Sequence, residues 1–207
     1  MIGTAHRLVL PCFGMNHDAC HLTLDPNTAN RNIRLSEGNR KVTVVTEEQS
    51  DPDHPERFNQ QLQVLCREGL TGRCYWEVEW SGEVSIAVAF RGIRRSGDDS
   101  LLGYNDQSWS LECSDNSYVV GHSGKSTIIP VRPSGSNRVA VYLDWSAGTL
   151  SFYKVSSDKL RLLHTFCSTF TEPLYPGFGV GFGFGIGCSS PGSGLVLVPV
   201  SQKEALA

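Results

Sequence analysis

Short runs in which apolar and polar residues alternate with a period of two constrain the fold of this chain more than any other feature. The clearest run, residues 72–80, places Trp76 and Trp80 on one face of an extended strand. A second run, residues 141–153, turns back near Gly148 and has the pattern of a β-hairpin. Because helical periodicity is almost absent, the sequence predicts an all-β protein, a two-sheet antiparallel β-sandwich with little helix.

The same alternation predicts strands along most of the chain, separated by Gly, Pro, Asn, Asp and Ser. Only residues 28–35 have a pattern that could form a turn or two of helix. After Pro176, glycine alternates with apolar residues as far as Gly187. A strand of this kind is poorly specified in register, so no structure is assigned to residues 177–194. The expected strands are 21–25, 41–45, 63–66, 72–80, 84–90, 108–113, 117–121, 127–129, 138–145, 149–154, 161–166 and 195–200.

The composition is that of one ordinary globular domain. The chain has 207 residues, of which 40 % are hydrophobic and 19 % are charged, and this suffices for one well-buried core. Its net charge of −3 lacks the basic excess expected of a nucleic-acid-binding protein. No apolar run approaches the roughly 20 residues of a membrane-spanning helix. We therefore expect one monomeric domain with no nucleic-acid partner and no membrane span.

The seven cysteines are odd in number, and none belongs to a Cys-x-x-Cys pair. Several fall inside strand patterns, so we expect buried, reduced thiols and a cytoplasmic location. Cys12, His17, Cys20 and His21 could in principle bind zinc, but their spacing matches no common zinc finger. The adjacent Cys20 and His21 would also point to opposite sides of a strand. No metal and no cofactor are predicted.

Motifs that look catalytic or nucleotide-binding are incomplete. Gly124-Lys125-Ser126 has the end of a phosphate-binding loop, but Val119 stands where the first glycine of that motif belongs. No convincing constellation of nucleophile, base or metal ligands is present in the sequence. The sequence predicts that the protein is not an enzyme.

Several motifs, in the expected order, resemble the PRY-SPRY family of protein-binding β-sandwiches. They are LTLDPNTA at 22–29, YWEVE at 75–79, WSL at 109–111, LDWSAGTLSFY at 143–153 and LYPGF at 174–178. The resemblance implies a concanavalin-like jelly roll with a PRY portion at residues 20–70 and a SPRY portion at residues 71–200. Residues 1–19 are then an N-terminal arm or linker, and residues 201–207 are a C-terminal tail.

By this resemblance, the chain is a protein-recognition module that selects the substrate or ligand of an innate immune or ubiquitin-ligase protein. Its motif sequences look most like those of fish tripartite-motif ubiquitin ligases and fish innate immune NOD-like receptors. Fish cytolysins carry a similar C-terminal module, and sandwiches of this general shape bind glycans. A subunit of a secreted pore-forming toxin and a glycan-binding lectin therefore stay open as alternatives.

The resemblance also indicates where a protein partner would bind. In relatives, loops of both portions build a shallow pocket with aromatic anchors and a charge nearby. Carried over to this sequence, the candidate wall is residues 109–114, which include Trp109, Glu112 and Ser114, together with the loop that ends at Phe178. Two charged loops are further candidates, because loop side chains set specificity. One loop carries Glu47, Glu48, Asp51 and Asp53, and the other carries Arg91, Arg94 and Arg95.

Overall fold

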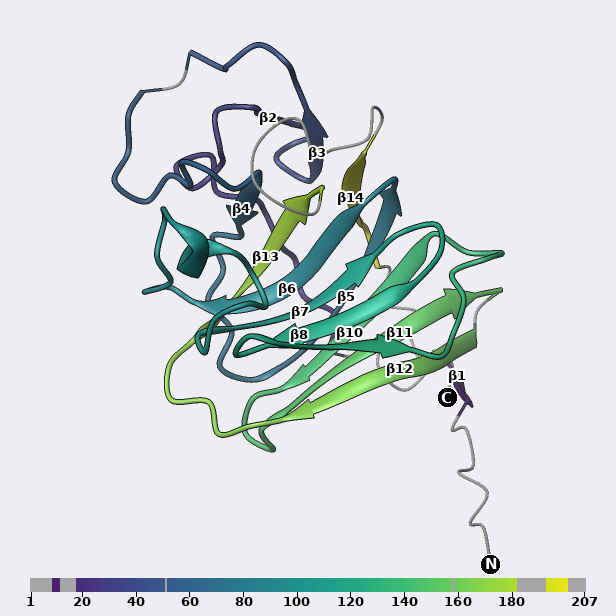
Figure 1. The fold of residues 1–207 in the computed structure, drawn as a ribbon. Coiled ribbons are helices and arrows are strands. Elements are labelled where there is room, and N and C mark those ends of the chain that lie inside the picture. The colour runs from purple at the N-terminus through teal and green to yellow at the C-terminus, as the bar shows by residue number, and fades with distance from the viewer. Residues whose placement is uncertain (1–8, 12–17, 51, 158, 182–192, 201–207) are drawn as a thin grey trace, which may run out of the picture.

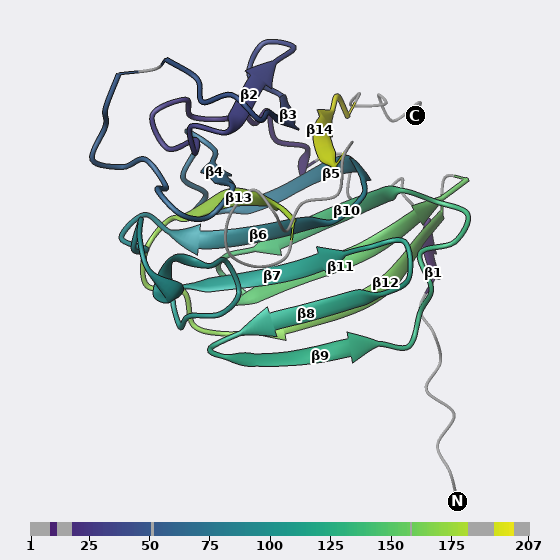
Figure 2. The same ribbon diagram turned by 45° about the horizontal axis from the view of Figure 1, so that its top comes forward.

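The structure is a computed structural model that describes residues 9–11, 18–50, 52–157, 159–181 and 193–200. Its strands form two antiparallel sheets that pack face to face, so the predicted β-sandwich is confirmed (Figures 1 and 2). A short 3-10 helix, η3 (Asp98–Ser100), lies in one of the connecting loops. No helix in the described ranges is long and apolar enough to cross a membrane.

Each sheet is built from strands that are distant in sequence. The larger sheet contains β1 (Val9–Pro11), β2 (Ile33–Ser36), β3 (Lys41–Val44), β5 (Arg73–Ser81), β10 (Arg138–Asp144), β11 (Thr149–Ser156), β12 (Lys159–Cys167) and β14 (Gly194–Val198). The smaller sheet contains β4 (Gln63–Leu65), β6 (Val84–Phe90), β7 (Ser108–Cys113), β8 (Tyr118–His122), β9 (Lys125–Ile129) and β13 (Leu174–Val180). Their spatial orders are β1-β12-β11-β10-β5-β14-β3-β2 and β4-β13-β6-β7-β8-β9.

The main hydrophobic core lies between the two sheets, as the alternation in the sequence predicts. Trp76 and Trp80 of β5 both face inward and are at most 4 % exposed. From the opposite sheet, Ile86 of β6 and Phe178 of β13 are fully buried in the same cluster. The hairpin between β10 and β11 turns at Gly148, whose φ of 69° is the left-handed conformation that glycine adopts readily.

Two expectations for the first part of the chain are wrong. Residues 28–35 form no helical turn, because Ile33–Ser36 is a strand that pairs with β3. Residues 21–25 contain only an isolated bridge between Leu24 and Cys66 rather than a strand. The buried hydroxyl of Thr28 accepts a hydrogen bond from the Leu65 backbone N–H at 2.9 Å. This bond holds the segment as a turn across the edge of β4.

Strand β13, which the sequence left unassigned, lies inside the smaller sheet and pairs with both β4 and β6. Phe178 faces the core, whereas Gly177 and Gly179 face outward. A Cβ atom on Gly177 would lie 2.8 Å from the Leu65 side chain, and one on Gly179 would lie 3.3 Å from Ser85. The side chains of Leu65 and Ser85 can therefore pack this closely on the outward face of β13 because positions 177 and 179 are glycines. Most of the remaining glycine repeat lies outside the described residues.

Two of the described cysteines are not the reduced thiols expected from the sequence. Cys20 and Cys74 form a disulfide that fastens the segment before Leu22 to β5. The backbone N–H of Cys20 donates to the Tyr75 carbonyl at 3.0 Å, which places the two cysteine Cα atoms 5.5 Å apart. This pairing also removes Cys20 from the zinc ligands considered above. Within the described ranges, no group of three or more potential metal ligands occurs.

The remaining described cysteines are free, and they differ in burial. Cys66 and Cys113 are buried, and burial raises the pKa of both thiols. Cys167 is exposed at the end of β12, contrary to the expectation of burial.

We expect a thiol reagent to distinguish three classes among the five cysteines that the structure describes; Cys12 and Cys188 lie outside the described residues. Cys167 should react first, because it is exposed. Cys66 and Cys113 should react only on unfolding, since burial excludes the reagent and disfavours the reactive thiolate. Cys20 and Cys74 should react only after reduction. Differential alkylation followed by peptide mass mapping measures this order, and labelling of Cys20 without reductant would contradict the disulfide.

Candidate protein-binding surface

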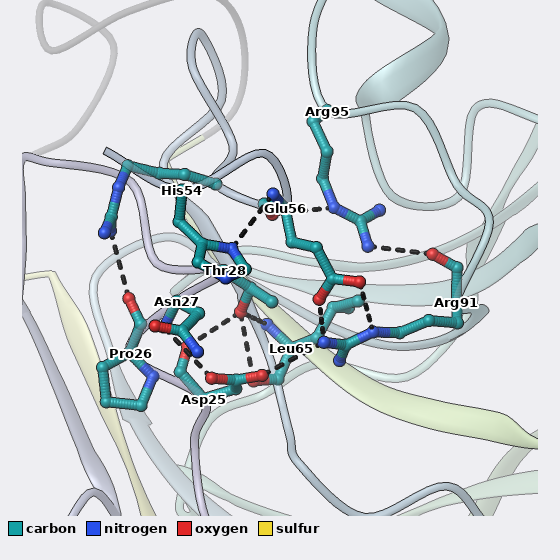
Figure 3. Close-up of polar contacts among 10 residues, drawn as sticks. Asp25, Pro26, Asn27, Thr28, His54, Glu56, Leu65, Arg91 and Arg95 are labelled. Atoms are coloured by element: carbon teal, nitrogen blue, oxygen red, sulfur yellow. Dashed lines mark hydrogen bonds and ion pairs between the residues drawn. The ribbon is translucent and has the colours of Figure 1, made fainter. Parts of the chain in front are cut away.

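The two predicted charged loops lie against each other, because internal ion pairs join them (Figure 3). Arg91 donates from Nε to the Glu56 carboxylate at 3.1 Å and also contacts that carboxylate through Nη2. The same Nη2 donates to Asp25 Oδ2 at 3.2 Å. The Arg91 guanidinium also lies 5.2 Å from the centre of the Tyr175 ring. Arg91 therefore joins parts of the fold and is not a free anchor for a partner.

The Arg95 guanidinium likewise makes contacts within the protein, with backbone carbonyls and an aromatic ring. Its Nε donates to the Glu56 carbonyl at 2.8 Å, and its Nη2 donates to the Arg91 carbonyl at 2.8 Å. Its guanidinium lies 4.9 Å from the centre of the Phe58 ring. Burial, together with the nearby charge of Arg91, lowers the pKa of Arg95 to about 10. Arg91 and Arg95 therefore hold the fold together, and their role as partner anchors stays a prediction.

The other charged candidates remain at the surface. Arg94 is 73 % exposed and pairs weakly with Asp99 at 3.6 Å. Asp53 is almost fully exposed and forms an ion pair with Arg31. Glu47 and Glu48 are also exposed. Asp51 lies outside the described residues.

The two aromatic residues predicted as anchors are part of the core. Phe178 is fully buried, because its position in β13 points between the sheets. Trp109 is 3 % exposed, and its ring stacks on His122 with the ring centres 4.5 Å apart. Phe90 and Phe170 pack edge-on against the same tryptophan ring. The predicted roles of Phe178 and Trp109 in binding are therefore wrong, because neither can reach a partner.

Glu112 lies on the opposite face of the same strand, and register places it in a row of outward-facing residues. Ser85 of β6 pairs with Glu112 of β7, Glu112 pairs with Val119 of β8, and Val119 pairs with Ile128 of β9. Figure 2 shows these four strands side by side. We call Ser85, Glu112, Val119 and Ile128 the outer row. Neighbours in such a row have Cβ atoms about 5 Å apart.

One end of this outer face is covered by the loop between β6 and β7. Leu102 of that loop packs in a second cluster with Ala87, Ala89 and Leu65. At Gly103 the loop approaches the sheet so closely that an added Cβ would collide with the Ser110 hydroxyl. The outer row lies beside the part of the sheet that this loop covers, and its residues become more exposed toward the edge strand β9. Ser85 is 6 % exposed, Glu112 and Val119 are partly buried, and Ile128 is 71 % exposed.

Tyr104, at the end of the covering loop, borders the outer row and interacts with Glu112. Partial burial raises the pKa of the Glu112 carboxyl above its usual range, and the hydrogen bond from the Tyr104 hydroxyl offsets part of this rise. Burial and the charge of Glu112 raise the pKa of Tyr104 in turn. With an exposure of 47 %, Tyr104 is, like Ile128, a large exposed hydrophobic side chain.

The Tyr104→Phe variant should raise the pKa of Glu112 further. The substitution removes a hydrogen bond that stabilises the ionised carboxylate and leaves the burial of the carboxyl largely unchanged. A pH titration of the Glu112 carboxyl carbon by NMR, in the parent and the variant, measures the change. An unchanged or lower pKa in the variant would show that the hydroxyl does not bind Glu112.

Ser114 closes the hairpin between β7 and β8 and is partly buried. Its backbone N–H donates to the Ser117 carbonyl at 3.1 Å, and its hydroxyl accepts from the Ser117 N–H at 3.2 Å. It follows the last residue of β7, two positions after Glu112. Of the predicted pocket wall, the structure therefore places Glu112 on the outer face and Ser114 in the turn beside it. Tyr104, Val119 and Ile128 were missed, although extending the register of the β7–β8 hairpin would have identified Val119.

A two-sheet antiparallel β-sandwich with one partly open outer face defines the structural class of this protein. Residues 22–70 match the family model of PRY, the SPRY-associated domain, and residues 73–191 match that of the SPRY domain. The chain belongs to the PRY-SPRY family. SPRY domains are generally protein-interaction modules.

Three similar proteins illustrate the range of the family. Stonustoxin subunit beta of Synanceia horrida is 48 % identical over 162 residues, which are 77 % of this chain and 23 % of the toxin subunit. Tripartite motif-containing protein 16 of Mus musculus is 39 % identical over 165 residues, 77 % of this chain and 29 % of that protein. The crystal structure of the TRIM65 PSpry domain is 29 % identical and superposes with a TM-score of 0.75, covering 88 % of this chain and 92 % of that one. The chain thus spans less than a third of the length of either curated relative.

Proposed function

We propose that this chain is a protein-recognition domain that binds its partner through Tyr104 and the outer row. The supporting observation is that Ile128 and Tyr104, two large hydrophobic side chains, are exposed around a half-buried carboxylate. Exposed apolar residues gathered on one face are typical of interaction sites, and aromatic residues often dominate the binding energy. The proposed module has no catalytic role of its own.

As part of a longer protein, the domain would select the target on which other domains act. This proposal follows the relation to Tripartite motif-containing protein 16, of which the chain spans 29 %. A role as the targeting part of a ubiquitin ligase or an innate immune receptor, acting in the cytoplasm, is the specific form that we propose.

A capture experiment with matched variants tests the proposed surface. The parent domain, Ile128→Glu and Leu162→Glu are used as baits in lysate of the native host cells. Leu162 is the control, because it is 37 % exposed on β12 of the other sheet. We expect a captured protein to be lost with Ile128→Glu and kept with Leu162→Glu. Retention by all three baits, with each variant shown to be folded, would place the binding surface elsewhere.

A second candidate is the C-terminal module of a secreted toxin subunit. Two observations favour it: the 48 % identity to Stonustoxin subunit beta, and the Cys20–Cys74 disulfide, a bond typical of oxidising compartments. Detection of the native protein in culture medium rather than in lysate of its host cells would support this candidate. Isolation of the protein from cytosol with Cys20 reduced would count against it.

A further inference from the structure

We infer that the partner segment presents a lysine or arginine side chain to Glu112, beside a branched aliphatic side chain that lies on Val119 and Ile128. This inference rests on the proposed function and assigns the chemistry of the partner at that same surface. Its evidence is the unbalanced charge of Glu112, an unpartnered hydroxyl beside it, and the apolar end of the outer row.

The charge of Glu112 is not balanced within the described residues. No ion pair involves this carboxylate in that part of the chain, and its interacting neighbour is the neutral Tyr104 hydroxyl. The exposed Arg94 lies against Asp99 and forms no ion pair with Glu112. Lys125 belongs to β9, but it lies an odd number of residues from Ile128 and so points to the other face of the sheet. A partly desolvated carboxylate without a cation is costly, and a cation from a partner would remove that cost.

The serine next to Glu112 provides a second, independent observation. Ser85 is 6 % exposed, and its hydroxyl has no hydrogen-bond partner among the described residues. It pairs with Glu112 in register, and its side chain points to the same face. Both an ammonium and a guanidinium group carry several N–H donors, so a cation on the Glu112 carboxylate has donors to spare for this hydroxyl. The hydroxyl oxygen is itself buried, so the cation reaches it only after a small shift of the side chains around it.

The surroundings of Tyr104 agree with a cationic partner. Beside this tyrosine lies a hollow of about 470 Å³, lined in part by Arg94, Asp99 and Asp106. Its two carboxylates and one guanidinium leave a net negative charge beside Tyr104. A surface of this sign speeds the approach of a basic segment and disfavours an acidic one.

The apolar end of the outer row sets the spacing of the partner's side chains. Glu112 and Ile128 are separated by two strand spacings, about 10 Å. An extended peptide advances about 3.3 Å per residue, so this distance corresponds to roughly three residues. The expected segment therefore carries a basic residue and a Val, Ile or Leu two to four positions apart, and it crosses the strands instead of adding to their edge.

A displayed library of random linear dodecapeptides, selected on the folded domain, tests the inference. We expect enrichment of basic and branched aliphatic residues at the stated spacing. A synthetic copy of an enriched peptide should bind Glu112→Gln about tenfold or more weakly, since a charge-assisted hydrogen bond is lost. The Gln variant keeps the size of the side chain and should fold, and Leu162→Glu should bind as the parent does.

The pH dependence of peptide binding provides a readout that a structural role alone would not produce. A cation favours the ionised carboxylate, so binding to the parent should weaken as pH falls through the raised pKa of Glu112. Peptide binding to Glu112→Gln should lose this dependence on pH.

Three results separate failure of the inference from failure of the proposed function. Selected peptides without a basic residue that still require Ile128 would overturn the cationic partner and leave the surface intact. Binding that is unaffected by Glu112→Gln would do the same. Selection of no peptide, or of peptides indifferent to both Ile128→Glu and Glu112→Gln, would overturn the inference and count against the surface itself.

Discussion

The Trp76→Ala variant is expected to lose about 3–5 kcal/mol of unfolding free energy, the range for truncation of a buried tryptophan. Trp76 is 2 % exposed and is among the largest fully buried side chains of the main core. It lies in β5, which pairs with both β10 and β14 near the middle of the larger sheet. Flanking strands on both sides hold the backbone in place, so the cavity cannot collapse easily.

The matched control is Trp76→Phe. Phenylalanine keeps an aromatic ring in the core and removes an indole N–H that has no hydrogen-bond partner among the described residues. Its cost should therefore be well below that of alanine. Urea unfolding of the three proteins gives the free energies. The alanine variant should also melt about 6–20 °C lower than the parent, given the usual response of a domain of this size. A melting temperature within one or two degrees of the parent would mean that Trp76 is not a core residue.

Alternation along single strands was sufficient to predict the sandwich and much of its core. The bounds of β6 and β7 agree with the expected ranges, and the inward face of β5 was assigned correctly. In β6 and β7, large apolar residues on the core face alternate with small or polar residues on the other face, so the period of two is visible in the sequence. Strand β13 was missed because glycine was treated as a weakness, whereas Gly177 and Gly179 allow Leu65 and Ser85 to approach.

The candidate site was harder to predict because it depends on contacts between distant segments. Arg91 looked like a free surface charge, but Asp25 and Glu56, from two other segments, neutralise it. Phe178 looked like an exposed anchor because the facing of β13 was unknown. Glu112 was predicted from the sequence as part of a pocket wall and lies on the outer face, whereas Tyr104 reaches it only through the path of a long loop. Nothing in the amino-acid composition of that loop predicts the path that brings Tyr104 to Glu112.

The Cys20–Cys74 disulfide was missed for the same reason. The two residues are 54 positions apart, and neither the odd number of cysteines nor their spacing points to this pair. Contacts formed on folding, among them the backbone hydrogen bond from Cys20 to Tyr75, bring them together. Sequence separation therefore hid both the disulfide and the Arg91 ion pairs.

The Arg91→Ala variant is expected to lose about 2 kcal/mol of unfolding free energy. Removing one member of a buried ion pair commonly costs about 3–5 kcal/mol, and we reduce this figure because Arg91 and Glu56 are each about one-third exposed. The Asp25 side chain is only 10 % exposed and would lose its cation. The stacking of the guanidinium on Tyr175 would be lost as well.

The neighbouring Arg94→Ala variant is the matched control, since it removes the same side chain from the same loop. Arg94 is 73 % exposed, and its contact with Asp99 at 3.6 Å is a surface pair, so its loss should change stability by less than about 0.5 kcal/mol. Urea unfolding compares the two variants, and a double-mutant cycle with Glu56→Ala isolates the ion pair. We expect Arg91→Ala also to speed proteolysis in residues 46–57, because Arg91 ties that loop to the sandwich through Glu56. Equal stability of the two arginine variants would show that Arg91 is a surface charge with no structural role, and it would strengthen Arg91 as a candidate for partner binding.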